Sequence, residues 1–197
     1  MTRIPLTHGL AGRVILLSRV MAMDQPDPVA WCIGRHFPFS HREVFPHGIE
    51  GVDIVDEPIG KRLGFLWNRG KTDIAKMQEC ARQLFDAMDL PTVPKRDLGV
   101  HFRGRRADGK SLADFEDEIL SAMAETTGEI ATLCDSMRWP ISQILGERMI
   151  PQTTHEMTHD MDREDLDVRA FLVEWWSLLN CQRIITNCPN SSIVINF

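Results

Sequence analysis

The amino-acid sequence predicts an α/β fold made of two halves, each with a mainly parallel sheet. Short apolar runs alternate with longer segments whose apolar residues recur at helical spacing, which is typical of parallel strands covered by helices. The length of 197 residues suits one large domain or two small ones. Pro91 and Pro94 interrupt the pattern near the middle of the chain. We therefore expect a first half over residues 1–94 and a second half over residues 95–197.

The first half is predicted to contain short strands and two helices. The clearer helix is expected over 73–88, because its apolar residues fall on one face of a helix. Another is expected over 13–23, after a glycine turn at Gly9 and Gly12. The histidine- and proline-rich stretch 35–47 is expected to be a loop. Strands are expected over 4–7, 29–33, 52–55 and 63–67.

The second half is predicted to alternate strands and helices as a doubly wound unit. Helices are expected after Ser111, after the pair Asp135 and Ser136, and over 165–180. Strands are expected over 98–102, 130–134, 149–150 and 183–186. Doubly wound sheets bind ligands outside the carboxyl ends of their strands. The segments expected at those ends are 101–106, 135–136 and 187–192.

The amino-acid composition limits the kinds of partner that the protein is expected to bind. The charged fraction of 25% and the hydrophobic fraction of 43% are those of an ordinary globular protein. The formal net charge of −6 disfavours a nucleic-acid partner. A local basic cluster stands against this acidic background, formed by Arg103, Arg105, Arg106 and Lys110. Such a local excess favours a small anionic ligand over a long polyanion.

Cysteine usage and hydropathy predict the compartment. The chain has five cysteines, an odd number, and no CxxC pair, which fits a reduced, cytosolic setting better than a disulfide scaffold. The first residues have no continuous apolar signal core, and no apolar run approaches the roughly 20 residues of a membrane span. We therefore expect a cytoplasmic protein with no membrane span.

The segment LGVHFRGRRADG carries the first candidate site. An apolar strand is expected to present His101 and Arg103 at its carboxyl end, and Gly104 and Gly109 follow in the loop. Arginine matches phosphate oxygens with two hydrogen bonds and keeps its charge. Fixed positive charge stabilises a diphosphate leaving group. The alternative interpretation is a solvated basic turn before a helix.

A second candidate lies in the helix, strand and loop from 174 to 192. The run NCPNSS offers hydroxyls, an amide and backbone donors directly after a strand, and a helix beginning at Ser191 would favour phosphate. Simple helix capping is the alternative. Glu174 lies between Val173 and Trp175 on an apolar helix, where a carboxylate requires a partner. It can accept hydrogen bonds from a ligand base or an arginine, or be a surface glutamate.

In order and spacing, these segments resemble the fucosyltransferase superfamily, which includes nodulation, N-glycan core and protein O-fucosyltransferases. Members open with a GLGNR-like turn and carry an HxRR-type strand end, a Thr-Asp-Ser-like strand end, a carboxylate-led late helix, an apolar strand and paired serines. The corresponding segments here are 9–13, 101–104, 133–136, 174–181, 184–186 and 191–192. Here Gly104 replaces the second arginine of HxRR, and Glu174 stands where the family usually has Asp.

The resemblance implies a GT-B-like fold of two Rossmann-like halves, with a reduced first half on the acceptor side and the donor held by the second. It implies inverting transfer from a GDP-sugar, GDP-fucose in particular, to a glycan or other hydroxyl acceptor, with no metal and no further cofactor. Arg103 would be the catalytic residue, holding the β-phosphate. His101 and Glu174 would contact guanine. The remaining donor-binding residues would be Gly9, Gly12, Arg13, Arg105, Arg106, Asp135, Ser191 and Ser192.

A competing motif indicates another class of enzyme. The run from His155 to His159 reads HEMTH and matches the HExxH pattern, in which two histidines bind zinc and a glutamate acts as base. Its flanks are polar, with no apolar stripe that would bury a zinc helix, so a chance occurrence in a loop is the favoured interpretation. A zinc hydrolase using His155, Glu156 and His159 remains an alternative, as does a domain that binds a nucleotide or glycan without turnover. For a transferase, Glu43 is a candidate base.

Overall fold

A computed structural model describes residues 2–3, 10–23, 29–33, 41–56, 73–103, 112–134, 141–151 and 167–188. Its elements belong to two compact units. The elements of the first unit lie within Met1–Leu90, and those of the second lie within Pro91–Asp160 and Asp167–Asn196. The boundary between the units therefore falls between Leu90 and Pro91, and Pro91 is the first of the two prolines that interrupt the sequence pattern.

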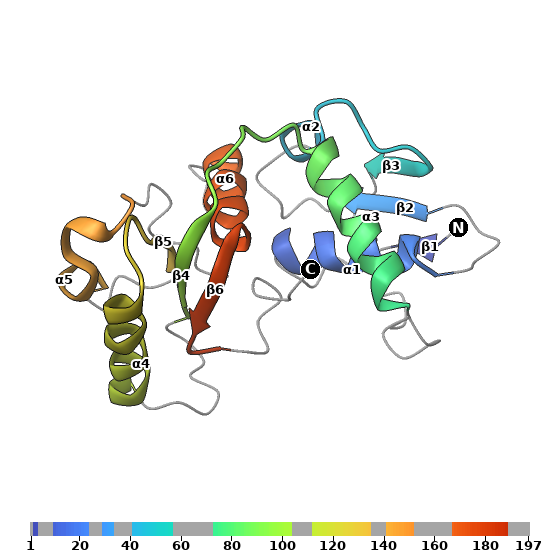
Figure 1. Cartoon of the computed structure of the whole chain (residues 1–197). Coiled ribbons are helices and arrows are strands. Elements are labelled where there is room, and N and C mark those ends of the chain that lie inside the picture. The colour runs from blue at the N-terminus through green and yellow to red at the C-terminus, as the bar shows by residue number, and fades with distance from the viewer. Residues whose placement is uncertain are drawn as a thin grey trace. The chain divides into compact units, whose positions relative to one another are not determined.

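The first unit has parallel strands in the order β1-β2-β3, with helices in the connections (Figure 1). Residues Val29 and Val52 are register partners in the pair formed by β2 and β3. The α/β class and the parallel strand direction predicted for this half are confirmed. The elements are β1 (Thr2–Arg3), α1 (Leu10–Met21), β2 (Val29–Ile33), α2 (His41–Val44), β3 (Val52–Asp56) and α3 (Ile74–Ala87).

Helix α3 is the predicted helix over 73–88, and its local signals account for both ends. The Asp73 side chain accepts hydrogen bonds from the N–H groups of Ala75 and Lys76 at 2.9 and 3.3 Å, which caps the first turn. The helix is capped at Met88, and Asp89 follows with a φ of 50°. The apolar face buries residues 81, 84, 85 and 88, and the helix packs on α1.

Two predictions for the first unit were wrong. Helix α1 begins at Leu10, so Gly12 and Arg13 lie inside its first turns and not in a turn before it. The buried Ala11 extends the apolar face of α1 toward the amino end, which explains the earlier start. Within the predicted loop 35–47, the structure has the short helix α2, which places Val44 in the core. The strands predicted over 4–7 and 63–67 lie outside the described residues.

The second unit has a sheet of parallel strands in the order β5-β4-β6, so the first strand of the unit is its centre. The strand predicted over 149–150 is reduced to a single parallel bridge between Ile130 and Met149, because a 3₁₀ turn at Gly146–Arg148 leads directly into it. The elements are β4 (Arg96–Phe102), α4 (Leu112–Glu125), β5 (Ala131–Cys134), α5 (Ile141–Leu145), α6 (Val168–Leu179) and β6 (Cys181–Thr186).

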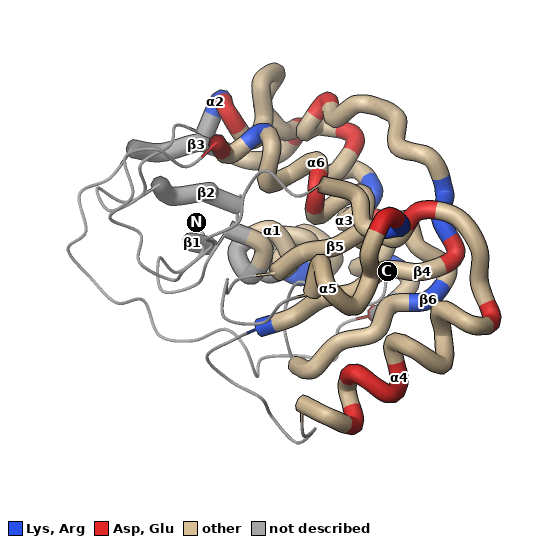
Figure 2. Tube along the Cα trace, turned by 90° about the vertical axis from the view of Figure 1, so that its left-hand side faces the viewer, with Lys and Arg blue, Asp and Glu red and all other residues tan. Residues whose placement is uncertain are grey.

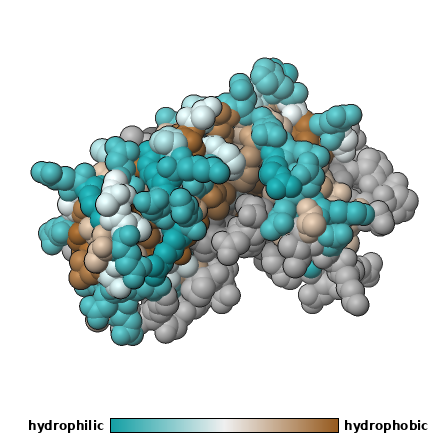
Figure 3. Space-filling model, in the orientation of Figure 1, coloured by the Kyte–Doolittle hydropathy of each residue, from teal (hydrophilic) through white to brown (hydrophobic). Residues whose placement is uncertain are grey.

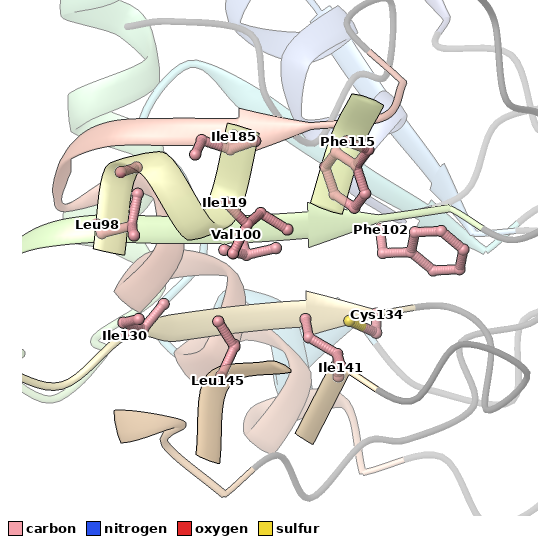
Figure 4. Packing of buried hydrophobic residues seen from close by; sticks show 11 residues of the cluster. Leu98, Val100, Phe102, Phe115, Ile119, Ile130, Cys134, Ile141, Leu145 and Ile185 are labelled. Carbon is pink, nitrogen blue, oxygen red and sulfur yellow. The ribbon is translucent and has the colours of Figure 1, made fainter. Parts of the chain in front are cut away.

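Helices cover both faces of this sheet. On one face, Val100 and Phe102 of β4 pack with Phe115 and Ile119 of α4, and α5 adds its own apolar side chains (Figure 4). The rings of Phe102 and Phe115 lie 5.9 Å apart between centroids. Because side chains alternate along a strand, the odd-numbered residues of β4 face the other way, toward α6, which contacts all three strands. The predicted doubly wound arrangement is therefore present in this unit.

The surface of the second unit is mostly hydrophilic on the side that Figure 3 displays. Helix α4 carries acidic residues on its exposed positions, among them Asp114, Asp117 and Glu125 (Figure 2). The exposed large hydrophobic residues in the described part of the chain are Leu112 and Leu120, also on α4. Within the same part, no helix is long and apolar enough to cross a membrane.

Candidate functional site

The candidate site is built where β4 and β6 end. These strands are neighbours in the sheet although β5 lies between them in the chain, and their pairing runs from Arg96 with Cys181 to His101 with Thr186. Because the strands are parallel, their carboxyl ends lie at the same edge of the sheet. Neighbouring strands that are not consecutive in the chain mark the point at which open α/β sheets bind ligands. The segments after β4 and β6 therefore begin side by side at a site with the right topology for a ligand.

His101 is a buried histidine at this edge, with 1% of its surface exposed. Its Nδ1 lies 2.8 Å from Oγ1 of Thr186. Burial, and to a lesser extent the positive charge of Arg103, lower the pKa of His101 to about 4. The imidazole is therefore neutral near pH 7 and adds no charge to this edge of the sheet.

The Thr186 hydroxyl links this neutral ring to the segment that follows β6. Its oxygen accepts a hydrogen bond from the N–H of Cys188 at 3.0 Å. The same hydroxyl is hydrogen-bonded to Nδ1 of His101, either as the donor to an unprotonated Nδ1 or as the acceptor from a protonated one. Thr186 therefore joins the end of β4 to the main chain just after β6.

Arg103 follows β4 directly, and its main chain is held by a side chain from beyond β6. The N–H of Arg103 donates to Oδ1 of Asn187 at 2.8 Å, and Nδ2 of Asn187 donates back to the carbonyl of Arg103 at 3.0 Å. The two residues are 84 positions apart in the chain, and Asn187 is 3% exposed. One amide thus satisfies both polar groups of the Arg103 main chain just past the end of the ladder.

The structure brings together part of the predicted site. His101 and Arg103 lie at the carboxyl end of β4, as expected from the sequence. Glu174 lies half-buried on α6, the helix on the His101 side of the sheet, and takes part in interactions there. Gly12 and Arg13 belong to α1 of the first unit. Gly9, Arg105, Arg106, Asp135, Ser191 and Ser192 lie outside the described residues.

Two residues of the site were not predicted individually. The sequence predicts a strand-end loop over 187–192, but it indicates no individual role for Asn187 or Thr186. The available signal was an asparagine immediately after an apolar strand. That signal became specific only when the strand order placed Asn187 beside Arg103.

The HEMTH motif and the candidate base Glu43 are the remaining predicted site residues. The run 155–159 lies outside the described residues, so the zinc prediction is untested. Across the described ranges, no group of three or more His, Cys, Asp or Glu side chains is arranged to hold a metal ion. Glu43 is exposed on α2 of the first unit, in a helix and not in the predicted loop.

Comparison with known proteins adds no assignment. No protein-family model matches the chain, and no solved structure matches it. The residues at the carboxyl ends of β4 and β6, together with the motif resemblance, are therefore the basis on which a function is inferred.

Proposed function

We propose that the protein is a glycosyltransferase that uses a nucleotide-diphosphate sugar, GDP-fucose in particular, and transfers the sugar to a hydroxyl of a glycan or another acceptor. One observation carries the proposal: Arg103 stands at the carboxyl end of the central strand of a parallel sheet, with its main chain held by Asn187. The GT-B-like arrangement, with the first unit on the acceptor side, is part of the proposal, as is a cytoplasmic location.

The chemistry requires compensation of negative charge on the leaving group. When the bond between the sugar and the diphosphate breaks, charge develops on the phosphate oxygens, and a fixed cation stabilises the transition state. Arg103 would supply this charge without a metal, because a guanidinium stays protonated and can bind two oxygens at once. Its fixed main chain would limit the side-chain ordering that donor binding requires.

His101 would have a distinct role. A histidine with a pKa of about 4 is neutral at the pH at which a cytoplasmic enzyme works, so it would add no charge beside Arg103. As the family resemblance implies, its ring would form a hydrogen bond with the guanine of the donor. Inversion also requires a base for the acceptor hydroxyl, for which Glu43 remains the candidate.

The proposal is tested by calorimetric titration of metal-free protein with GDP, GDP-fucose and UDP-glucose. Arg103→Ala should weaken binding of the GDP compounds by about a hundredfold, because it removes charged hydrogen bonds to phosphate. Arg183→Ala is the matched control, because it removes the same charge from β6 at a side chain that is 46% exposed and paired with Glu125 at 3.1 Å. The Arg183→Ala variant should bind the GDP compounds as tightly as wild-type protein does. Folded wild-type protein that binds none of the three nucleotides would contradict the proposal.

Further measurements distinguish the alternatives. GDP binding without transfer or hydrolysis would favour a nucleotide-binding domain without turnover. Stoichiometric zinc by elemental analysis, with a hydrolytic activity lost in the double variant His155→Ala, His159→Ala, would favour the zinc hydrolase.

A further inference from the structure

The two hydrogen bonds between the Asn187 side chain and the Arg103 main chain lie where regular strand pairing has ended. The ladder between β4 and β6 ends at His101 and Thr186, so the residues that follow are no longer paired between these two strands. At this point Asn187 contributes one acceptor and one donor, which are the two groups that a neighbouring strand would otherwise supply. Its side chain therefore extends the sheet by one residue on the β4 side.

The chemistry of the bridge requires an amide. A carboxylate of the same shape can accept from the Arg103 N–H but has no proton for the Arg103 carbonyl, and a serine hydroxyl is too short to reach both groups. The amide is also buried, so water cannot replace it without rearrangement. Only a residue with both a carbonyl and an NH₂ group on a short side chain satisfies these conditions.

We infer that Asn187 is a positioning residue: by holding both main-chain groups of Arg103, it directs the Arg103 guanidinium to the anion that binds at the carboxyl ends of β4 and β6. The inference rests on the proposed function for the identity of that anion, a nucleotide diphosphate. Asn187 acts through Arg103 and is not assigned a contact with the ligand.

A double-mutant cycle tests whether the effect passes through Arg103. In calorimetry with GDP, Asn187→Ala should weaken binding by about tenfold, because the arginine must then be ordered on binding. In an Arg103→Ala background the same change should alter the remaining affinity by less than about twofold. Equal losses in both backgrounds would overturn the inference, since a general structural effect would act whether or not Arg103 is present.

The chain offers a matched control at the other end of the same strand. Asn180 directly precedes β6 and is half-buried, and its Nδ2 donates to the carbonyl of Trp176 at 2.9 Å. Asn180→Ala therefore removes an asparagine and a side-chain hydrogen bond at the amino end of β6. It should reduce stability without changing GDP affinity, whereas Asn187→Ala should change both.

A ligand-free measurement separates this inference from the proposed function. In Asn187→Ala, the Arg103 amide should exchange with solvent about tenfold faster or more, and the Arg103 Nε–H should show a lower NMR order parameter. Both should stay unchanged in Asn180→Ala. If Asn187→Ala does not fold, Asn187→Ser is used and the same direction is expected.

Different experimental results would contradict the positioning role and the proposed function. Wild-type protein that binds no GDP, with Arg103 still loosened in the Asn187 variant, would contradict the proposed function and support the positioning role. An Arg103 amide and side chain that remain as ordered as in wild type would overturn the positioning role, whatever the protein binds.

Discussion

Nδ1 of His101 lies 2.8 Å from Oγ1 of Thr186, and the same two residues are the last register partners of β4 and β6. A side-chain hydrogen bond thus joins the strands where their backbone pairing ends. Arg103, two residues after His101, and Asn187, directly after Thr186, are joined by two more hydrogen bonds. The carboxyl ends of these strands are therefore held together by side chains from segments that are far apart in the chain.

The buried His101 should make the protein less stable in mild acid. Its pKa is about 4 in the folded protein, against about 6.5 when exposed. Between these values the unfolded chain binds more protons, so the free energy of unfolding should fall as pH falls from about 6.5 to 4. The full shift corresponds to about 3 kcal/mol. Urea denaturation of wild type and His101→Gln across this range checks the prediction, and identical pH slopes would contradict it.

Gly99 should not tolerate a side chain. A Cβ at this position would lie 2.8 Å from Cδ1 of Leu178 and 2.9 Å from Sγ of Cys181. Gly99→Ala should therefore force α6 and the start of β6 away from β4, at a cost of about 1–3 kcal/mol in urea denaturation. Leu178→Ala removes the nearer atom, so the loss in the double variant should be smaller than the sum of the two single losses. Additive losses would argue against this clash.

Replacing Thr132 by valine should make the folded protein more stable. Its Oγ1 is buried, and no hydrogen-bond partner is found for it in the described part of the chain. Thr132→Val keeps the shape and removes an unsatisfied group, so we expect the free energy of unfolding to rise by about 1 kcal/mol. Thr186→Val is the matched control, because the Thr186 hydroxyl is hydrogen-bonded, and it should lower stability by about 1 kcal/mol. A loss of stability in Thr132→Val would indicate that the hydroxyl has a partner.

Arg148 should contribute much of the stability of the loop between α4 and β5. Its guanidinium donates to the carbonyls of Met123 and Gly128 at 2.9 and 2.8 Å and to Oγ1 of Thr126 at 3.2 Å. Arg148→Met leaves these acceptors without that donor at the end of α4, and should lower the free energy of unfolding by about 2 kcal/mol. Arg183→Met, which breaks an exposed ion pair, should change it by less than about 1 kcal/mol. Comparable losses in a denaturant titration would contradict the prediction.

Local pattern alone was sufficient for much of the secondary structure. Helix α3 was predicted because Asp73 and the apolar positions after it are neighbours in sequence. Strands β2, β3 and β4 were predicted from short apolar runs of the right length. The errors occurred where local signals were outweighed by burial, as in α2, where Val44 and Phe45 are in the core although the surrounding stretch resembles a loop.

The sequence by itself determined the α/β class, the parallel strands and the placement of His101 and Arg103 at a strand end, because each depends on residues close together in the chain. Only the tertiary structure decided the order β5-β4-β6, and with it the partners of that strand end. The bond from His101 to Thr186 and the bridge from Arg103 to Asn187 join residues 85 and 84 positions apart. Hydrogen bonds over such separations leave no periodic trace in a single sequence, because they form only when packing of helices on both faces brings the two strands side by side.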